Sequence, residues 1–151
     1  MKRLIAATAA LALTPSLAAA AQPVTHFAAT RSPVPGTAAP AFSTSVMAGD
    51  TLYVSGVLDS DPATNKMGTS AEESAKLVLD AFKRGVEAGG LTMDDVVWIQ
   101  IFATDLSYYA KFNDIYRTYF KGPLPARAFI GTNQLLNGAH FEAMGVAVRS
   151  K

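Results

Sequence analysis

The fold is decided by two stretches, Pro125-Ala126-Arg127-Ala128-Phe129-Ile130 and His140-Phe141-Glu142-Ala143-Met144-Gly145-Val146-Ala147-Val148-Arg149. Both read as apolar strands, and each carries a charged residue among its apolar ones. Glu142 shares its strand parity with Met144, Val146 and Val148, so its carboxylate faces the same side as three apolar side chains. A half-buried carboxylate is costly unless it is paired or hydrogen-bonded, and Arg127 is the nearest candidate partner. The spacing leaves two interpretations open, a structural ion pair that closes a sheet or a shared functional site.

The rest of the fold follows by working outward from these strands. The periodicity predicts a hairpin over 41–47 and 51–57, a helix over about 71–88, a central strand over 96–103, a second helix over 108–120, and strands over 127–132 and 140–148. Thr69 or Ser70 with Glu72 or Glu73 forms a capping box for the first helix, and Asp105 or Ser107 caps the second. The order ββαβαββ predicts a single α+β domain with two helices on one face of a mixed sheet.

The N-terminal residues read as an export signal. Lys2 and Arg3 precede an apolar run from Leu4 to Leu17 and the small residues Ala18-Ala19-Ala20-Ala21. We expect a signal peptide over 1–21, an extended leader over 22–40 that holds four prolines, and the folded domain over 41–151. A retained anchor is the alternative, but the run is shorter than the ~20 residues of a membrane span. The expected location is periplasmic or secreted, with no membrane contact after cleavage.

Composition excludes several classes of function. Without Lys2 and Arg3 the chain holds 11 basic against 12 acidic residues, and no basic run tracks phosphates, so we expect no nucleic-acid partner. Cysteine is absent, which excludes thiol chemistry and cysteine-based metal sites. Only His26 and His140 could supply imidazole, so no metal site is expected. For His140 a surface position and a pH-sensitive place beside the site both stay open.

An oligomer is expected from the arrangement of the layers. Two helices on one face of the sheet leave the other face bare, and these strands are too apolar to face water. Clefts between subunits are places where buried polar groups converge into sites.

A family resemblance rests on five motifs in order: Gly49-Asp50 with Val54-Ser55-Gly56, Ala88-Gly89-Gly90-Leu91-Thr92-Met93-Asp94-Asp95-Val96-Val97, Asp105-Leu106 to Phe120 with Asn113 and Tyr116, Pro125-Ala126-Arg127, and Phe141-Glu142-Ala143. Over about 40–149 the chain resembles the RidA/YjgF family of enamine/imine deaminases. The resemblance implies a homotrimer with three inter-subunit clefts. It also implies that Arg127 binds the substrate carboxylate, that Glu142 positions a water, and that Ser55 and Asn113 lie in the pocket.

The chemistry of these side chains fits the implied roles. An arginine fork binds a carboxylate bidentately and stays charged, and a carboxylate near a water can orient it and take its proton. Hydrolysis of an imine in this way needs no metal and no organic cofactor. Two simpler roles also stay open: Ser55 could satisfy backbone groups, and Asn113 could be a local brace.

The chain departs from the family pattern at two positions. Phe42 stands where the well-studied deaminases carry a tyrosine, and Phe129 where they commonly carry a cysteine. If both line the cleft of Arg127, larger or aromatic substrates are favoured; the alternative is that Phe129 packs in the sheet and Phe42 guards a subunit seam. The leading function is hydrolytic deamination of enamine or imine acids, and the alternative is a non-catalytic binder of small carboxylates. A nuclease or translation inhibitor is disfavoured by the acidic balance.

Overall fold

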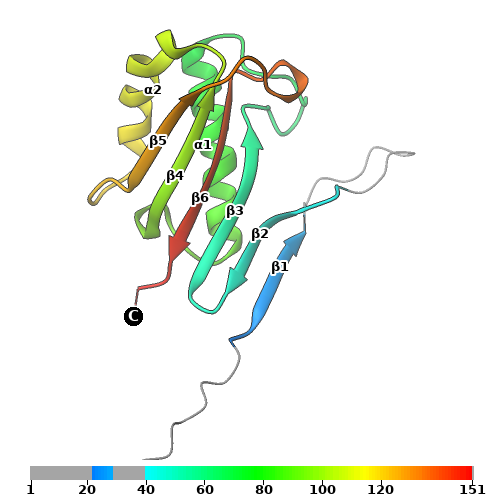
Figure 1. Cartoon of the computed structure of the whole chain (residues 1–151), viewed down its shortest axis with the longest axis vertical. Helices are drawn as coiled ribbons and strands as arrows, with labels where there is room; N and C mark the ends of the chain where they lie inside the picture. The colour runs from blue at the N-terminus through cyan, green and yellow to red at the C-terminus, as the bar shows by residue number, and fades with distance from the viewer. Residues whose placement is uncertain (1–21, 29–39, 151) are drawn as a thin grey trace, which may run out of the picture.

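A computed structural model describes residues 22–28 and 40–150 of the chain. Their strands join in one mixed sheet in the order β1-β2-β3-β6-β4-β5 (Figure 1). The β4–β5 pair is parallel and the other pairs are antiparallel. The elements are β1 (Val24–Ala28), β2 (Ser43–Ala48), β3 (Thr51–Leu58), α1 (Ala71–Ala88), β4 (Val96–Ala103), α2 (Tyr109–Tyr116), β5 (Ala126–Gly131) and β6 (Phe141–Val148), with 3-10 turns at Met93–Asp95, Leu106–Tyr108, Arg117–Tyr119 and Leu136–Gly138.

Helix α1 begins and ends where its sequence predicts. The Ser70 hydroxyl accepts a hydrogen bond from the Glu73 backbone N–H at 3.2 Å, and Gly89 follows the last turn. The face that looks at the sheet is fully buried, as its spacing of three and four residues requires: it consists of Ala75, Val78, Leu79, Phe82 and Val86. This face covers the centre of the sheet and builds most of the core with α2.

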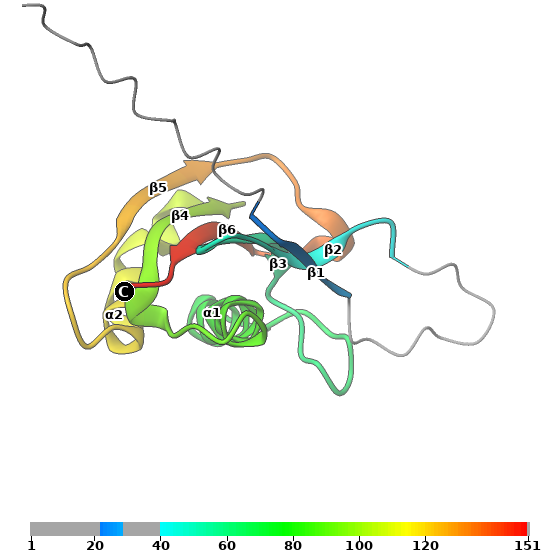
Figure 2. The ribbon, with the colours of Figure 1, turned by 90° about the horizontal axis from the view of Figure 1, so that it is seen from below.

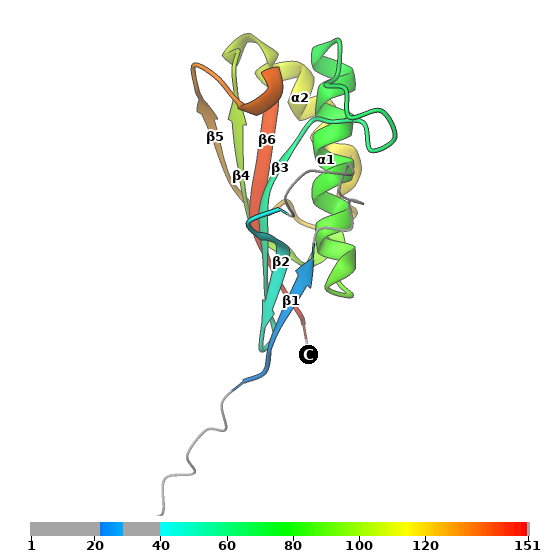
Figure 3. The same cartoon turned by 90° about the vertical axis from the view of Figure 1, so that its right-hand side faces the viewer.

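Both helices lie on the same side of the sheet, and the opposite side has no helical layer (Figures 2 and 3). The bare face carries large apolar side chains, among them Trp98, Met144 and Val146, and a tyrosine, Tyr53, that is 53% exposed. The α+β class and the placement of both helices on one face are therefore confirmed. An apolar sheet face of this kind is typical of a subunit interface.

The expected leader over 22–40 contains a strand that the sequence analysis did not predict. Strand β1 pairs antiparallel with β2, with Val24 opposite Ala48, so the element order becomes βββαβαββ. The alternation in Val24–Ala28 is weak, because only Phe27 is partly buried in an otherwise exposed segment. This strand forms through backbone hydrogen bonds with β2, and its sequence has no hydrophobic pattern that would predict it. The expected signal peptide over 1–21 and residues 29–39 lie outside the described residues.

The second helix is shorter than predicted. Asp105 caps the turn before it, accepting a hydrogen bond from the Ser107 N–H at 2.8 Å, but the α-helical part ends at Tyr116. The turn Arg117–Tyr119 continues it as a 3-10 helix. There the Thr118 hydroxyl donates a hydrogen bond to the Ile115 carbonyl at 2.7 Å, so a side chain satisfies a carbonyl at the end of the α-helix. No helix among the described residues is long and apolar enough to cross a membrane.

Candidate functional site

Arg127 is held at the edge of the sheet beside α2. Strand β5 pairs in parallel with β4, and Arg127 lies opposite Ile99, whose buried side chain faces the helices. Neighbours in a sheet point to the same side, so the Arg127 side chain also turns toward the helical layer. There its guanidinium donates to the Asn113 side-chain oxygen at 2.6 Å. Asn113 lies in the middle of α2, so it braces the arginine, and the arginine lies in a partly buried place.

Three aromatic rings surround the Arg127 guanidinium. Its central carbon lies 4.6 Å from the ring centre of Tyr116, 5.6 Å from that of Tyr109 and 5.7 Å from that of Phe129. Cation–π contacts with these rings hold a guanidinium without neutralising it. The arginine therefore has no carboxylate partner among the described residues and keeps its charge for an external anion.

An open depression of about 160 Å³ lies over this arginine. Arg127, Asn113 and Pro125 line it, together with Leu124, Arg117, Tyr109 and Tyr116. None of these residues is acidic, so the depression favours an anion. Within the described residues, no group of three or more histidines and carboxylates could hold a metal ion.

The two tyrosines of the depression have opposite pKa shifts. Tyr116 is only 3% exposed, its hydroxyl has no hydrogen-bond partner among the described residues, and burial raises its pKa to about 12. Tyr109 is exposed, and a hydrogen bond with Asn113, followed by the charge of Arg127, lowers its pKa. Tyr116 is thus a fixed neutral donor, while the Tyr109 hydroxyl lies in the field of the arginine.

Glu142 lies on the other face of the sheet. It alternates with buried Phe141 and Ala143 in β6 and is paired with Phe102 and Leu58. Its carboxylate rests on Gly56, where any Cβ atom would collide with Oε1, and β3 is irregular at this place, between Val54 and Val57. Burial raises the pKa of Glu142.

Arg127 and Glu142 therefore do not meet within one chain. The expected structural ion pair between them is wrong for the described subunit, because the two side chains leave the sheet on opposite faces. The parity of Glu142 with Met144, Val146 and Val148 is confirmed. The parity of Glu142 in β6 does not determine on which face of the sheet a residue of β5, two strands away, lies. Sequence spacing therefore suggested a pair with Arg127 that the strand register does not allow.

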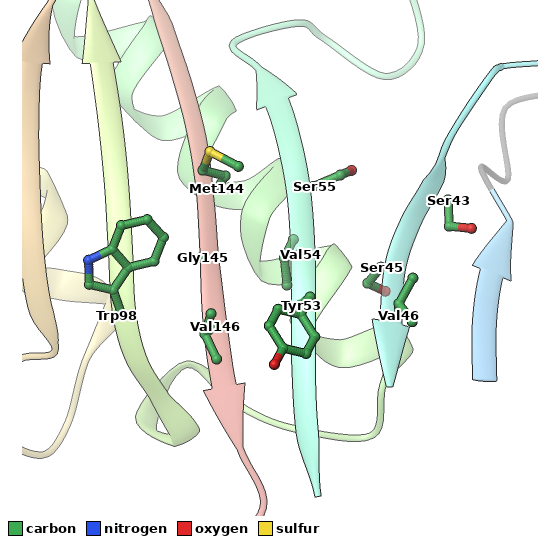
Figure 4. Close-up of a pocket in the computed structure, with 10 residues that line it drawn as sticks. All are labelled: Ser43, Ser45, Val46, Tyr53, Val54, Ser55, Trp98, Met144, Gly145 and Val146. Carbon is green, nitrogen blue, oxygen red and sulfur yellow. The ribbon is translucent and has the colours of Figure 1, made fainter. Parts of the chain in front are cut away.

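Ser55 lies near Glu142, in a second depression on the bare face. This depression measures about 250 Å³ and has an apolar floor between β2, β3, β6 and β4. Figure 4 shows Trp98, Met144, Val146 and Tyr53 along it, with Ser55 at its upper part. The Ser55 hydroxyl donates a hydrogen bond to the Thr44 carbonyl at 3.0 Å. Ser55 therefore satisfies a backbone group, which is one of the two roles expected for it.

Phe129 and Phe42 do not come together in one chain. Phe129 neighbours Arg127, but its ring packs edge-on against Tyr109 and Phe112, at centroid distances of 5.1 and 5.3 Å, and belongs to the margin of the core. Phe42 is 58% exposed and precedes β2, which β3, β6 and β4 separate from β5. The packing role of Phe129 is therefore observed, and a shared apolar lining by both rings would need a second subunit.

His140 belongs to a buried polar cluster that the sequence analysis missed. Asp59 is fully buried, and its carboxylate accepts hydrogen bonds from the backbone N–H groups of His140 and Phe141 at 2.9 and 3.2 Å. The His140 Nδ1 lies 3.3 Å from Asp59 Oδ2 and 3.2 Å from the Ser74 hydroxyl. The cluster ties β6 to the end of β3 and to α1, so His140 has a structural place.

Tyr109, Tyr116 and Arg117 are further residues of the depression that were not predicted as site residues. A signal for the tyrosines was present, because residues 109, 113 and 116 are spaced by four and three and share one helix face. Asn113 was identified, and the structure places it in direct contact with Arg127.

Comparisons with known proteins agree with this architecture. The family model described as endoribonuclease L-PSP matches residues 34–149. The 2-iminobutanoate/2-iminopropanoate deaminase of Rattus norvegicus is 35% identical over 111 residues, which are 72% of this chain and 80% of the rat protein. Crystal structures of RidA from an Antarctic Psychrobacter and of Escherichia coli TdcF with bound serine superpose with TM-scores of 0.70 and 0.71, at 31% and 28% identity. They cover 75% and 77% of this chain, and 92% and 93% of theirs. The chain belongs to the RidA/YjgF family, whose fold its sheet and two helices reproduce.

Proposed function

We propose that this protein hydrolyses the imines and enamines of 2-amino acids to 2-oxo acids and ammonia. The observation that carries the proposal is the Arg127 guanidinium, which Asn113 and three rings orient in an open depression without any acidic neighbour. A fork held in this way is ready to bind the carboxylate of an amino-acid derivative in two parallel hydrogen bonds. Relatives named as 2-iminobutanoate/2-iminopropanoate deaminases support a reaction of this class.

The reaction balances with water as the only co-reactant. An enamine becomes an iminium by protonation at carbon, and an imine becomes the same iminium by protonation at nitrogen. Water adds to the C2 carbon as its proton passes to a base, which gives a tetrahedral carbinolamine. Its nitrogen then takes a proton, the C–N bond breaks as the hydroxyl loses its proton and forms the C=O bond, and ammonia and the 2-oxo acid are released. Arg127 fixes the carboxylate next to C2, so it positions the reacting carbon, and a carboxylate is suited to accept the proton of the water.

Glu142 is the proposed base, and its position requires a second subunit. It leaves the sheet on the bare face, away from the Arg127 of its own chain. We propose a homotrimer in which the apolar faces are covered and Glu142 of one subunit reaches the Arg127 depression of the next. Burial raises the pKa of Glu142, which makes its carboxylate a better proton acceptor than an ordinary glutamate.

A second candidate is a non-catalytic binder of small carboxylates. It is favoured by the fact that the carboxylate-binding arginine is complete within one chain, whereas the proposed base is not. The TdcF neighbour was crystallised with bound serine, a small amino acid, which agrees with either candidate. Release of ammonia separates the two.

We also propose that the protein acts outside the cytoplasm, in the periplasm or after secretion. Support comes from Lys2 and Arg3, the apolar run that follows them, and the alanines at 18–21. Detection of a chain that begins after position 21 in the periplasmic or extracellular fraction would test this location.

Activity of the purified chain without residues 1–21 tests the proposed function. An amino-acid oxidase generates 2-iminopropanoate from alanine, semicarbazide traps the imine that survives, and the protein should lower the trapped fraction while ammonia appears faster. Arg127→Ala should reduce kcat/KM by at least thirtyfold, because loss of a buried charge pair costs roughly 2 to 5 kcal/mol. Arg84→Ala, which removes an exposed arginine of α1, is the matched control and should keep the activity. Unchanged ammonia release in the parent would favour the binder, and an active Arg127→Ala would remove this arginine from the site.

A further inference from the structure

A second arginine lies in the same depression as Arg127. Arg117 follows directly after α2, at the start of the turn Arg117–Tyr119, and lines the depression with Arg127 and Asn113. Its side chain is exposed and makes no ion pair or hydrogen bond with the other residues that the structure describes. The depression thus contains two guanidinium groups and no acidic residue that could neutralise either.

Both arginines act on the same hydroxyl group. The charges of Arg127 and, more weakly, Arg117 contribute to lowering the pKa of Tyr109, after its hydrogen bond with Asn113. Arg117, Arg127 and Tyr109 all line the same depression. A ligand that enters between the two arginines meets positive charge at two points, and a single carboxylate can satisfy only one fork bidentately.

The buried tyrosine adds a third polar point. The hydroxyl of Tyr116 is shielded from solvent and has no hydrogen-bond partner among the described residues, although its ring contacts Arg127. A buried hydroxyl without a partner is unfavourable, so a ligand whose entry moves the neighbouring side chains and uncovers this hydroxyl would gain a hydrogen bond from it. The depression therefore offers more donors than a small monocarboxylate can use.

We propose that this depression selects 2-imino acids that carry a second carboxylate, the class formed when aspartate or glutamate is oxidised at its α-carbon. This inference rests on the proposed function and specifies its substrate. Arg127 binds the carboxylate next to the imine carbon, and Arg117 binds the carboxylate at the end of the side chain. The preference for aromatic side chains that Phe42 and Phe129 suggested would need Phe42 of a second subunit, because within one chain Phe129 packs against the core and Phe42 lies away from this depression.

Two substrates of equal length give the sharpest kinetic test. The imines of glutamate and norvaline share a five-carbon chain and differ in the terminal group, a carboxylate in the first and a methyl in the second. We expect the parent to prefer the glutamate imine by tenfold or more in kcat/KM, and Arg117→Gln to lower that ratio about tenfold. Lys111→Gln removes an exposed charge of α2 outside the depression and should keep the ratio. Equal rates for both imines in the parent, or an unchanged ratio in Arg117→Gln, would overturn the inference.

A binding measurement keeps the inference testable if no imine is hydrolysed. Calorimetric titration with 2-oxoglutarate and 2-oxopentanoate measures the same selectivity on stable compounds. We expect 2-oxoglutarate to bind more tightly than 2-oxopentanoate and to lose more affinity as the salt concentration rises. Arg117→Gln should weaken 2-oxoglutarate binding five- to tenfold, and Lys111→Gln should not. Selective binding without ammonia release would reject the deaminase and keep the dianion site. Preference for phenylpyruvate or for 2-oxopentanoate would reject the dianion site, whatever the protein catalyses.

Discussion

At the scale of single residues, Arg127 and Glu142 show two ways of keeping a charged group in an apolar setting. Arg127 is solvated by the protein itself, through the Asn113 oxygen and three aromatic faces, so it stays charged. Glu142 has no cationic partner among the described residues, and burial alone raises its pKa. The arginine is thus the proposed anion-binding group, and the glutamate is the proposed base.

The raised pKa of Glu142 predicts a pH dependence of the rate with a definite sign. As pH falls through this pKa the carboxylate gains a proton and can no longer take one from water, so kcat should fall on the acid side, at a higher pH than an ordinary glutamate would give. Glu142→Gln should lower kcat at least a hundredfold and flatten that limb, because the amide keeps the shape without the base. A pH–rate profile measures both effects.

Stability provides the control for the same substitution. Because the folded-state pKa of Glu142 lies above its unfolded value, ionisation disfavours the folded form, and the parent should lose stability as pH rises through that window. The glutamine of Glu142→Gln cannot titrate, so its free energy of unfolding, measured with urea, should depend less on pH in that window than the parent's does. An equal loss of ligand affinity and of rate would instead place Glu142 in contact with the substrate.

At the scale of elements, predictions from sequence succeeded where a hydrophobic period was strong. Helix α1 has a complete apolar stripe and a cap at Ser70, and its bounds were predicted. Strand β1 has no such stripe, since it lies at the sheet edge with mostly exposed side chains, and it was missed. For the site, Arg127 and Asn113 were identified as separate candidates, but their contact depends on the β4–β5 register, which no local pattern encodes.

Strand β6 gives a prediction at this scale, because it passes very close to its neighbours at Gly145. A Cβ atom at this position would lie 2.5 Å from the Trp98 carbonyl oxygen and 2.9 Å from the Phe82 ring, in the middle of the sheet. Gly145→Ala should therefore destabilise the protein by about 1 to 3 kcal/mol or prevent folding. Gly56→Ala is the informative comparison, since its Cβ meets the mobile end of Glu142, which can turn away. Urea unfolding should show a much smaller loss for Gly56→Ala; similar losses would contradict this account of Gly145.

At the scale of the whole molecule, the bare sheet face is the surface that the proposed trimer would cover. Tyr53, Val146 and Trp98 lie next to one another across β3, β6 and β4 on the side without helices (Figure 4). Such a face is stable in water only when another apolar surface covers it. In the proposed trimer the bare face of one subunit, which carries Glu142, meets the edge of the next subunit where the Arg127 depression lies beside α2.

A charge on that face should break the assembly. Light scattering of the parent should give three times the mass of one chain, and Tyr53→Glu should lower it toward a single chain, because burying an unpaired carboxylate costs several kcal/mol. Lys111→Glu places the same carboxylate on the exposed side of α2 and should leave the mass unchanged. A trimer that survives Tyr53→Glu would move the interface elsewhere.

The central place of β6 has a consequence for how the protein is made. This strand comes after the other described strands in the chain, yet it lies between β3 and β4 and pairs with both. Until residues 141–148 have left the ribosome, the hairpin β2–β3 and the pair β4–β5 have no strand to join them, so the sheet cannot close. Folding waits for the longest-range contacts and is correspondingly slow. If the chain is exported as proposed, this delay keeps the sheet from closing until synthesis is nearly complete, which favours the unfolded state that an export channel accepts.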